Sequence, residues 1–275
     1  KMKQVLATGA ALSMALSMTP VTASAADKVD INVIAAQYGQ QTADWWANFV
    51  TEFNEANPDI NLNVEVVSWN DIYTVVNTRI ANGEAPDVLN IDVFADYQAD
   101  DLLLPIQDVV SEETYSKMYD AFLAQSEVDG TVWAIPDLAS ARAMYYNKDI
   151  LDAAGVEVPT TWDEFEEVLQ KLSDAGIQPL TTGGSDKWGA TRLINAYAVR
   201  TAGNDIMTKA ADGEVPYTDE KLVAAADKIA EWAEKGYFGE GITTVDMNTA
   251  GSMLMSGKAA IFYNGSWFTQ NLTDD

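Results

Sequence analysis

Carboxylates are the only abundant side chains in this sequence that could carry out acid–base chemistry. The chain has 42 Asp and Glu residues, no His and no Cys. It also lacks a Gly-x-Ser-x-Gly nucleophile turn, a phosphate-binding glycine loop and a cluster of metal ligands. The sequence indicates ligand binding more clearly than catalysis, because Trp188 follows Gly183 and Gly184 in a segment too polar for a core helix. An exposed indole there would offer a surface on which a ligand could stack.

Further candidate ligand contacts follow the strands expected in the first part of the chain. Apolar periodicity predicts strands over 30–36, 60–66 and 86–92 and helices over 46–53 and 72–80. A β-α-β-α-β order calls for right-handed crossovers and a sheet with parallel strands. Such sheets bind ligands beyond the carboxyl ends of their strands. The candidates at those ends are Gln37, Tyr38, Asp92 and Phe94.

The second part of the chain has equally clear helix signals. Thr161 and Glu164 have the spacing of a capping box, and an apolar stripe follows them until Gly176. Trp162 lies on that stripe and Trp46 on the apolar face of the first helix, so we assign both to the core. Further apolar patterns predict a helix from about 218 to 236, and then a helix, a Gly-Lys turn and a strand over 250–263.

Composition narrows the possible partners. With 16 basic residues against its 42 acids, the chain has a net charge of -26, which disfavours nucleic acids and anionic membranes. Its length and its 48% hydrophobic content suffice for two domains. Residues 1–25 have the lysines, the short apolar run and the Ala-x-Ala ending of a cleavable signal peptide. Because no cysteine is present to carry a lipid anchor, we expect export to the periplasm or the cell surface.

Four segments together resemble the family 1 extracellular solute-binding proteins, the sugar receptors of ATP-binding-cassette importers, among them maltose-binding protein. The segments are Asp129-Gly130-Thr131-Val132-Trp133-Ala134-Ile135-Pro136, Met144-Tyr145-Tyr146-Asn147-Lys148-Asp149-Ile150, Pro159-Thr160-Thr161-Trp162-Asp163-Glu164-Phe165, and residues 250–267, which end in Asn264-Gly265-Ser266-Trp267. The resemblance implies an α/β fold of the two-lobed, type II periplasmic-binding-protein kind, in which helices flank a mostly parallel sheet in each lobe. It places the lobes at 26–138 and 139–275, with the C-terminal part of the second lobe missing. Ser140 and Trp267 become ligand contacts, Trp267 by stacking on a sugar ring.

The resemblance also implies a function and partners. We expect a protein that captures a sugar or oligosaccharide between hinged lobes and delivers it to a membrane permease, acting as a monomer without metal or cofactor. A secreted carbohydrate-active enzyme with an Asp/Glu pair is the alternative. A surface adhesin would show repeats, and none are visible. Arg142 is interpreted as pairing with a nearby acid. With only Arg192 and Arg200 besides it beyond the first lobe, a carboxylated or phosphorylated ligand is less favoured, although one arginine would suffice.

Overall fold

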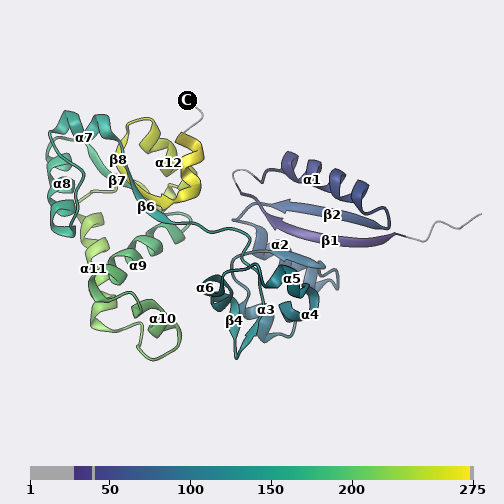
Figure 1. Ribbon diagram of the computed structural model, residues 1–275. Coiled ribbons are helices and arrows are strands. Elements are labelled where there is room, and N and C mark those ends of the chain that lie inside the picture. Colours follow the sequence, from purple (N-terminus) through teal and green to yellow (C-terminus); the bar gives the residue numbers. More distant parts are fainter. Residues whose placement is uncertain (1–27, 39–40, 273–275) are drawn as a thin grey trace, which may run out of the picture. The chain divides into compact units, whose positions relative to one another are not determined.

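The computed structural model describes residues 28–38 and 41–272 (Figure 1). The predicted signal peptide at 1–25 lies outside the described residues. Contacts divide the described chain into two compact units. The first unit comprises the residues up to Gln37, Gln41–Ser68 and Ile72–Asn90, and the second comprises Tyr38, Trp69–Asp71 and the residues from Ile91 onward. None of the described helices is both long and apolar enough to cross a membrane.

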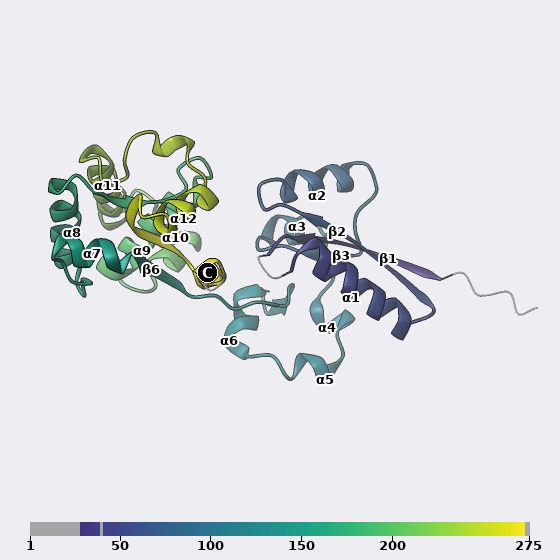
Figure 2. The ribbon, with the colours of Figure 1, turned by 90° about the horizontal axis from the view of Figure 1, so that it is seen from above.

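The first unit is a three-stranded parallel sheet with two crossover helices. In chain order its elements are β1 (Val29–Ala36), α1 (Ala43–Ala56), β2 (Ile60–Val67), α2 (Ile72–Ala81) and β3 (Val88–Asn90). The strand order β2-β1-β3 places β1 in the centre. Right-handed crossovers to opposite sides of a central strand put the two helices on opposite faces, as Figures 1 and 2 show. The strand predicted over 86–92 is present as β3 but is shorter.

The apolar face of α1 is only partly covered. Ile34, Ala35 and Ala36 of β1 are buried, yet α1 contains no buried residue. Trp46, assigned to the core from the sequence, is half-buried. It lines a groove of about 430 Å³ between α1 and β2. Asn57 caps the end of the helix, with its backbone N–H donating to the Phe53 carbonyl oxygen at 2.9 Å.

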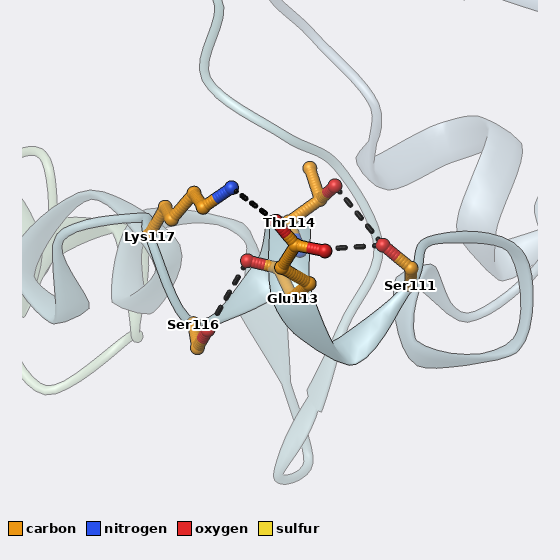
Figure 3. A network of polar contacts seen from close by, with 5 residues as sticks. All are labelled: Ser111, Glu113, Thr114, Ser116 and Lys117. Carbon is orange, nitrogen blue, oxygen red and sulfur yellow. Dashed lines mark hydrogen bonds and ion pairs between the residues drawn. The ribbon is translucent and has the colours of Figure 1, made fainter.

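Short elements form the first part of the second unit. These are α3 (Ala95–Ala99), α4 (Ile106–Val109), α5 (Glu112–Tyr115), α6 (Asp120–Leu123), the 3-10 helix η1 (Ala124–Ser126) and the hairpin of β4 (Glu127–Val128) and β5 (Thr131–Val132). Side chains must hold helices this short, because one turn is unstable alone. At α5 the Ser111 hydroxyl accepts the Thr114 N–H at 3.3 Å, and Lys117 pairs with Glu113 at 2.8 Å (Figure 3).

The rest of the second unit surrounds a second three-stranded sheet. Its strands are β6 (Arg142–Tyr146), β7 (Gln178–Thr181) and β8 (Ala259–Gly265), in the order β6-β8-β7. The β7–β8 pair is parallel and the β6–β8 pair is antiparallel, so this sheet is mixed. Its helices are α7 (Lys148–Ala154), α8 (Trp162–Asp174), α9 (Trp188–Ala202), α10 (Ile206–Ala211), α11 (Glu220–Glu234) and α12 (Met247–Met255), with the 3-10 helices η2 (Ile242–Thr244) and η3 (Ser266–Leu272).

One core cluster connects the helices and strands of this sheet region. Residues of α8, β7, α11 and β8 pack together, with Leu172, Trp232 and Ile261 completely buried. The capping box predicted at Thr161 and Glu164 is present, and Glu164 accepts the Thr161 N–H at 3.2 Å. Trp162 is half-buried against this core. The sheet region therefore provides a rigid base for the loops at the ends of its strands.

Candidate functional site

Tyr38, the first residue beyond the sheet after β1, is the centre of one group of candidate contacts. Because β1 and β3 are adjacent and parallel, the segments that follow them leave the sheet side by side. The ring of Tyr38 lies edge-on to Trp69, with 5.4 Å between centroids, and Trp69 follows β2 closely. Asp92, after β3, and Asp137, after β5, are near enough to act on the Tyr38 hydroxyl. We call Tyr38, Trp69, Asp92 and Asp137 the acidic cluster.

The acidic cluster perturbs its tyrosine. Burial raises the pKa of Tyr38 to about 12, and the negative charges of Asp137 and Asp92 act in the same direction. The Tyr38 hydroxyl is therefore a neutral hydrogen-bond donor throughout the physiological range, beside two carboxylates that only accept. Such a set suits a ligand rich in hydroxyl groups, which both donate and accept. Asp92 is near enough to act on Tyr38, and its contact with a ligand stays a prediction.

A second group of candidates lies where β6, β8 and α9 meet. The rings of Trp188 and Trp267 have their centroids 6.5 Å apart. The guanidinium carbon of Arg142 lies 4.4 Å from the Trp267 centroid and 5.5 Å from that of Trp188. Arg192 follows Trp188 by one helical turn on α9, which places both on the same face. We call Arg142, Arg192, Trp188 and Trp267 the arginine cluster.

The position of Trp267 follows from strand register. Gly265, the last residue of β8, pairs with Arg142 of β6. A Cβ at Gly265 would overlap the six-membered ring of Trp267, so the absence of a side chain lets the indole fold back over the strand. The backbone N–H of Ser266 donates to the Ala141 carbonyl oxygen at 2.8 Å and fixes the start of η3. The indole thereby comes to lie beside Arg142, and it remains 39% exposed.

Trp188 is positioned by the turn that precedes α9. Lys187 has a φ of 63°, in a region that residues other than glycine rarely adopt, and is directly followed by Trp188. Gly189 is buried, and a Cβ there would meet Met247 of α12 and Thr182. Close packing of α9 on α12 therefore requires a glycine. The expectation that this segment is too polar for a core helix is wrong, because α9 runs for 15 residues with Leu193 and Ala198 buried.

The ion pairing of Arg142 differs from the interpretation made from the sequence. Arg142 makes no ion pair with any of the described residues, so its interpretation as the partner of a local acid is wrong. Burial lowers the pKa of Arg142, and the positive charge of Arg192 lowers it further. Burial raises the pKa of Tyr263, which feels the opposing positive charges of Arg142, Arg192 and Arg200. Three guanidinium groups thus share one neighbourhood.

The remaining sequence-predicted contacts lie outside these two clusters. Gln37 is exposed and extends the sheet through its N–H, which donates to the Val67 carbonyl oxygen at 2.9 Å. Phe94 is half-buried at the start of α3, and Ser140 is exposed within residues 133–141, which form neither helix nor strand. Among the described residues, no ring contact joins Phe94 to either cluster, and no group of His, Cys, Asp or Glu could hold a metal ion. The roles of Gln37, Phe94 and Ser140 as ligand contacts stay predictions.

Trp69 and Asp137 are members of the acidic cluster that the sequence interpretation missed. Trp69 comes two residues after the end of β2, at the same carboxyl edge as Tyr38 and Asp92. The rule that selected those two residues could therefore have selected Trp69. Asp137 is different, because its neighbours along the chain form no regular element that would predict its approach to Tyr38.

Comparison with known proteins agrees with this architecture. Residues 38–274 match the family described as bacterial extracellular solute-binding proteins. A probable sugar-binding periplasmic protein of Rhizobium meliloti (strain 1021) is 29% identical over 218 residues, which are 73% of this chain and 51% of that protein. A putative binding protein of Brucella abortus (strain 2308) is 26% identical over 256 residues, covering 92% of this chain and 62% of the relative.

Solved structures show the same fold. A chitin oligosaccharide binding protein superposes with a TM-score of 0.81 at 24% identity, over 91% of this chain and 64% of that structure. The chain thus spans less than two thirds of the length of the proteins that it resembles. The family match covers most of the chain and includes both clusters. On this evidence the chain belongs to the bacterial extracellular solute-binding protein family.

Proposed function

We propose that this protein is the extracytoplasmic receptor of an ATP-binding-cassette importer and that it captures a sugar or oligosaccharide for delivery to a membrane permease. The observation that carries the proposal is the pair of Trp188 and Trp267, whose centroids lie 6.5 Å apart at the end of β8. Indole faces match the apolar face of a pyranose ring. The exposure of Trp267, 39%, leaves part of its ring accessible to such a ligand.

The acidic cluster supports the same proposal from a different chemistry. Its two carboxylates accept hydrogen bonds, and the Tyr38 hydroxyl donates one at physiological pH. Sugar hydroxyl groups satisfy both kinds of partner. The relatives described above are named as binding proteins, which favours capture over the alternative of hydrolysis by an Asp/Glu pair.

We propose that the receptor works by hinged closure of two lobes at 26–138 and 139–275. Residues 133–141 form neither helix nor strand, as expected of a segment that bends. Closure over a ligand would create the surface that the permease recognises. The protein would act as a monomer in the periplasm or at the cell surface.

The test uses the full-length protein without residues 1–25, the predicted signal peptide. Tryptophan fluorescence and isothermal titration calorimetry are measured with neutral mono-, di- and trisaccharides, and the same mixtures are analysed for products by chromatography. We expect saturable binding with no change in the sugar. Release of shorter sugars or reducing ends would show an enzyme, and failure of every sugar to bind would reject the proposal.

A further inference from the structure

The arginines of this chain differ in whether they form ion pairs. Arg79, in the first unit, pairs with Glu65 at 3.0 Å and with Glu84 at 3.1 Å. The other three, Arg142, Arg192 and Arg200, make no ion pair with any described residue. These three arginines therefore have guanidinium groups that no described carboxylate neutralises, in a chain with 42 acids and 16 basic residues.

The unpaired arginines also share a defined geometry. Arg142 is fixed on β6 opposite Gly265, with its guanidinium carbon 4.4 Å from the Trp267 centroid. A guanidinium over an indole is held by cation–π attraction, which orients its plane and leaves its N–H groups free at the edges. Arg192 stands one turn beyond Trp188 on α9 and is exposed. One guanidinium held against two aromatic rings therefore has a second, exposed cation near it.

The acid nearest in sequence to this site is already engaged elsewhere. Asp186 lies two residues before Trp188, but its Oδ2 accepts the backbone N–H of Met247 at 2.7 Å at the start of α12. Its Oδ1 lies 3.5 Å from the Ser185 hydroxyl. No described carboxylate forms an ion pair with either guanidinium, so the N–H groups of these two exposed side chains are available to a bound anion.

We propose that the arginine cluster binds the carboxylate of a hexuronic acid residue while its indoles contact the sugar ring, an inference that rests on the proposed function. The planar fork of an arginine matches a carboxylate with two parallel N–H···O bonds. A ligand with both a pyranose face and a carboxylate uses the aromatic and the cationic members of the cluster together. This reverses the expectation from sequence that acidic sugars are less favoured.

The overall charge favours a carboxylate over a phosphate. The chain carries a net charge of -26, so every anion is repelled at long range. A phosphate group carries about -1.5 to -2 charges at neutral pH, whereas a carboxylate carries only one. The long-range repulsion is therefore smaller for the monoanion. A uronate is therefore the acidic sugar that this receptor accommodates best.

Calorimetry of the full-length protein with matched sugars tests the proposal. The probes are galacturonate against galactose, glucuronate against glucose, digalacturonate against neutral disaccharides, and glucose 6-phosphate. We expect a uronate to bind roughly 10-fold tighter or more than its neutral counterpart, since a charge-assisted bond is added. If neutral sugars bind and uronates bind no better, or if the phosphate binds best, this inference fails while the sugar receptor stands. If nothing binds, both fail.

Substitution of Arg142 and Arg192 tests whether these side chains cause the preference for a uronate. Arg192→Gln removes an exposed cation from the surface of α9 and should reduce the uronate-to-neutral affinity ratio several-fold without altering thermal stability. Arg142→Gln should reduce it further, and Arg192→Lys should restore part of it, because lysine keeps the charge but not the fork. Arg79→Gln, the same change at a distant ion pair, is the matched control and should leave the ratio unchanged. An unchanged ratio in both Arg142→Gln and Arg192→Gln would overturn the proposal.

Discussion

The acidic cluster and the arginine cluster are built alike but carry opposite charge. Each brings two aromatic rings together, Tyr38 and Trp69 in one, and Trp188 and Trp267 in the other. In the first, two carboxylates act on Tyr38; in the second, Arg142 lies over Trp267 and is acted on by Arg192. The comparison teaches that a net charge of -26 does not describe the binding chemistry, which is set locally.

In each cluster a neighbouring charge shifts the pKa of one member. The carboxylates make ionisation of Tyr38 harder, and Arg192 makes protonation of Arg142 harder. Perturbed pKa values often occur at functional sites, so each cluster is a separate candidate for ligand binding.

Removal of the exposed indole should break the arginine cluster most severely. In Trp267→Ala the sugar loses its stacking surface, and Arg142 loses the ring that orients it. We expect ligand affinity to fall by about 2 kcal/mol or more, the range of interfacial aromatic anchors. Calorimetry with the tightest-binding sugar measures this loss.

Trp45→Ala is the matched control, because Trp45 is similarly exposed, at 40%, on α1 in the other unit. Its affinity should equal that of the wild type. Equal losses in the two variants would mean that the effect of Trp267→Ala is structural and that the cluster is not a ligand site.

Local sequence rules predict the elements of this fold well. The capping box at Thr161 and the periodicity over 60–66 each specify their own segment, and the structure contains both. Burial is harder to predict. Trp46 lies on the correct face of α1 but remains half-buried, because amphipathicity identifies a face without saying what covers it.

The candidate site shows the same limit more strongly. Tyr38 and Asp92 could be placed together from sequence, because parallel strands present their carboxyl ends at one edge. The meeting of Arg142 with Trp267 depends on an antiparallel register between residues 142 and 265, which no local pattern encodes. The strained backbone at Lys187 and the close packing at Gly189 likewise arise only from tertiary contacts.

A test of the acidic cluster depends on the Tyr38 hydroxyl. Tyr38→Phe should weaken sugar binding by about 1 kcal/mol, the usual net worth of one hydrogen bond. The raised pKa, about 12, keeps the hydroxyl protonated where an ordinary tyrosine, with a pKa near 10, begins to ionise. The affinity ratio of wild type to Tyr38→Phe should therefore stay constant from about pH 7 to pH 10.5, measured by calorimetry. A ratio that collapses near pH 10 would contradict the burial of this hydroxyl.

The smallest effect on binding is expected from the cap of α12, which supports only the arginine cluster. Asp246 accepts the Thr249 N–H at 2.6 Å, and this bond lowers the pKa of Asp246. Asp246→Ala should cost about 1 kcal/mol of unfolding free energy at pH 7 in urea titrations, as other lost caps do. Because the folded pKa is depressed, the stabilisation is present above the ordinary aspartate value near 3.9 and is lost as pH falls through the folded pKa. The difference in unfolding free energy between wild type and Asp246→Ala should therefore shrink in acid.

Asp246→Asn keeps an acceptor and should show little loss at either pH, and sugar affinity at pH 7 should be unchanged in both variants. A large loss of affinity would mean that the arginine cluster depends on the position of α12 and is less rigid than the acidic cluster.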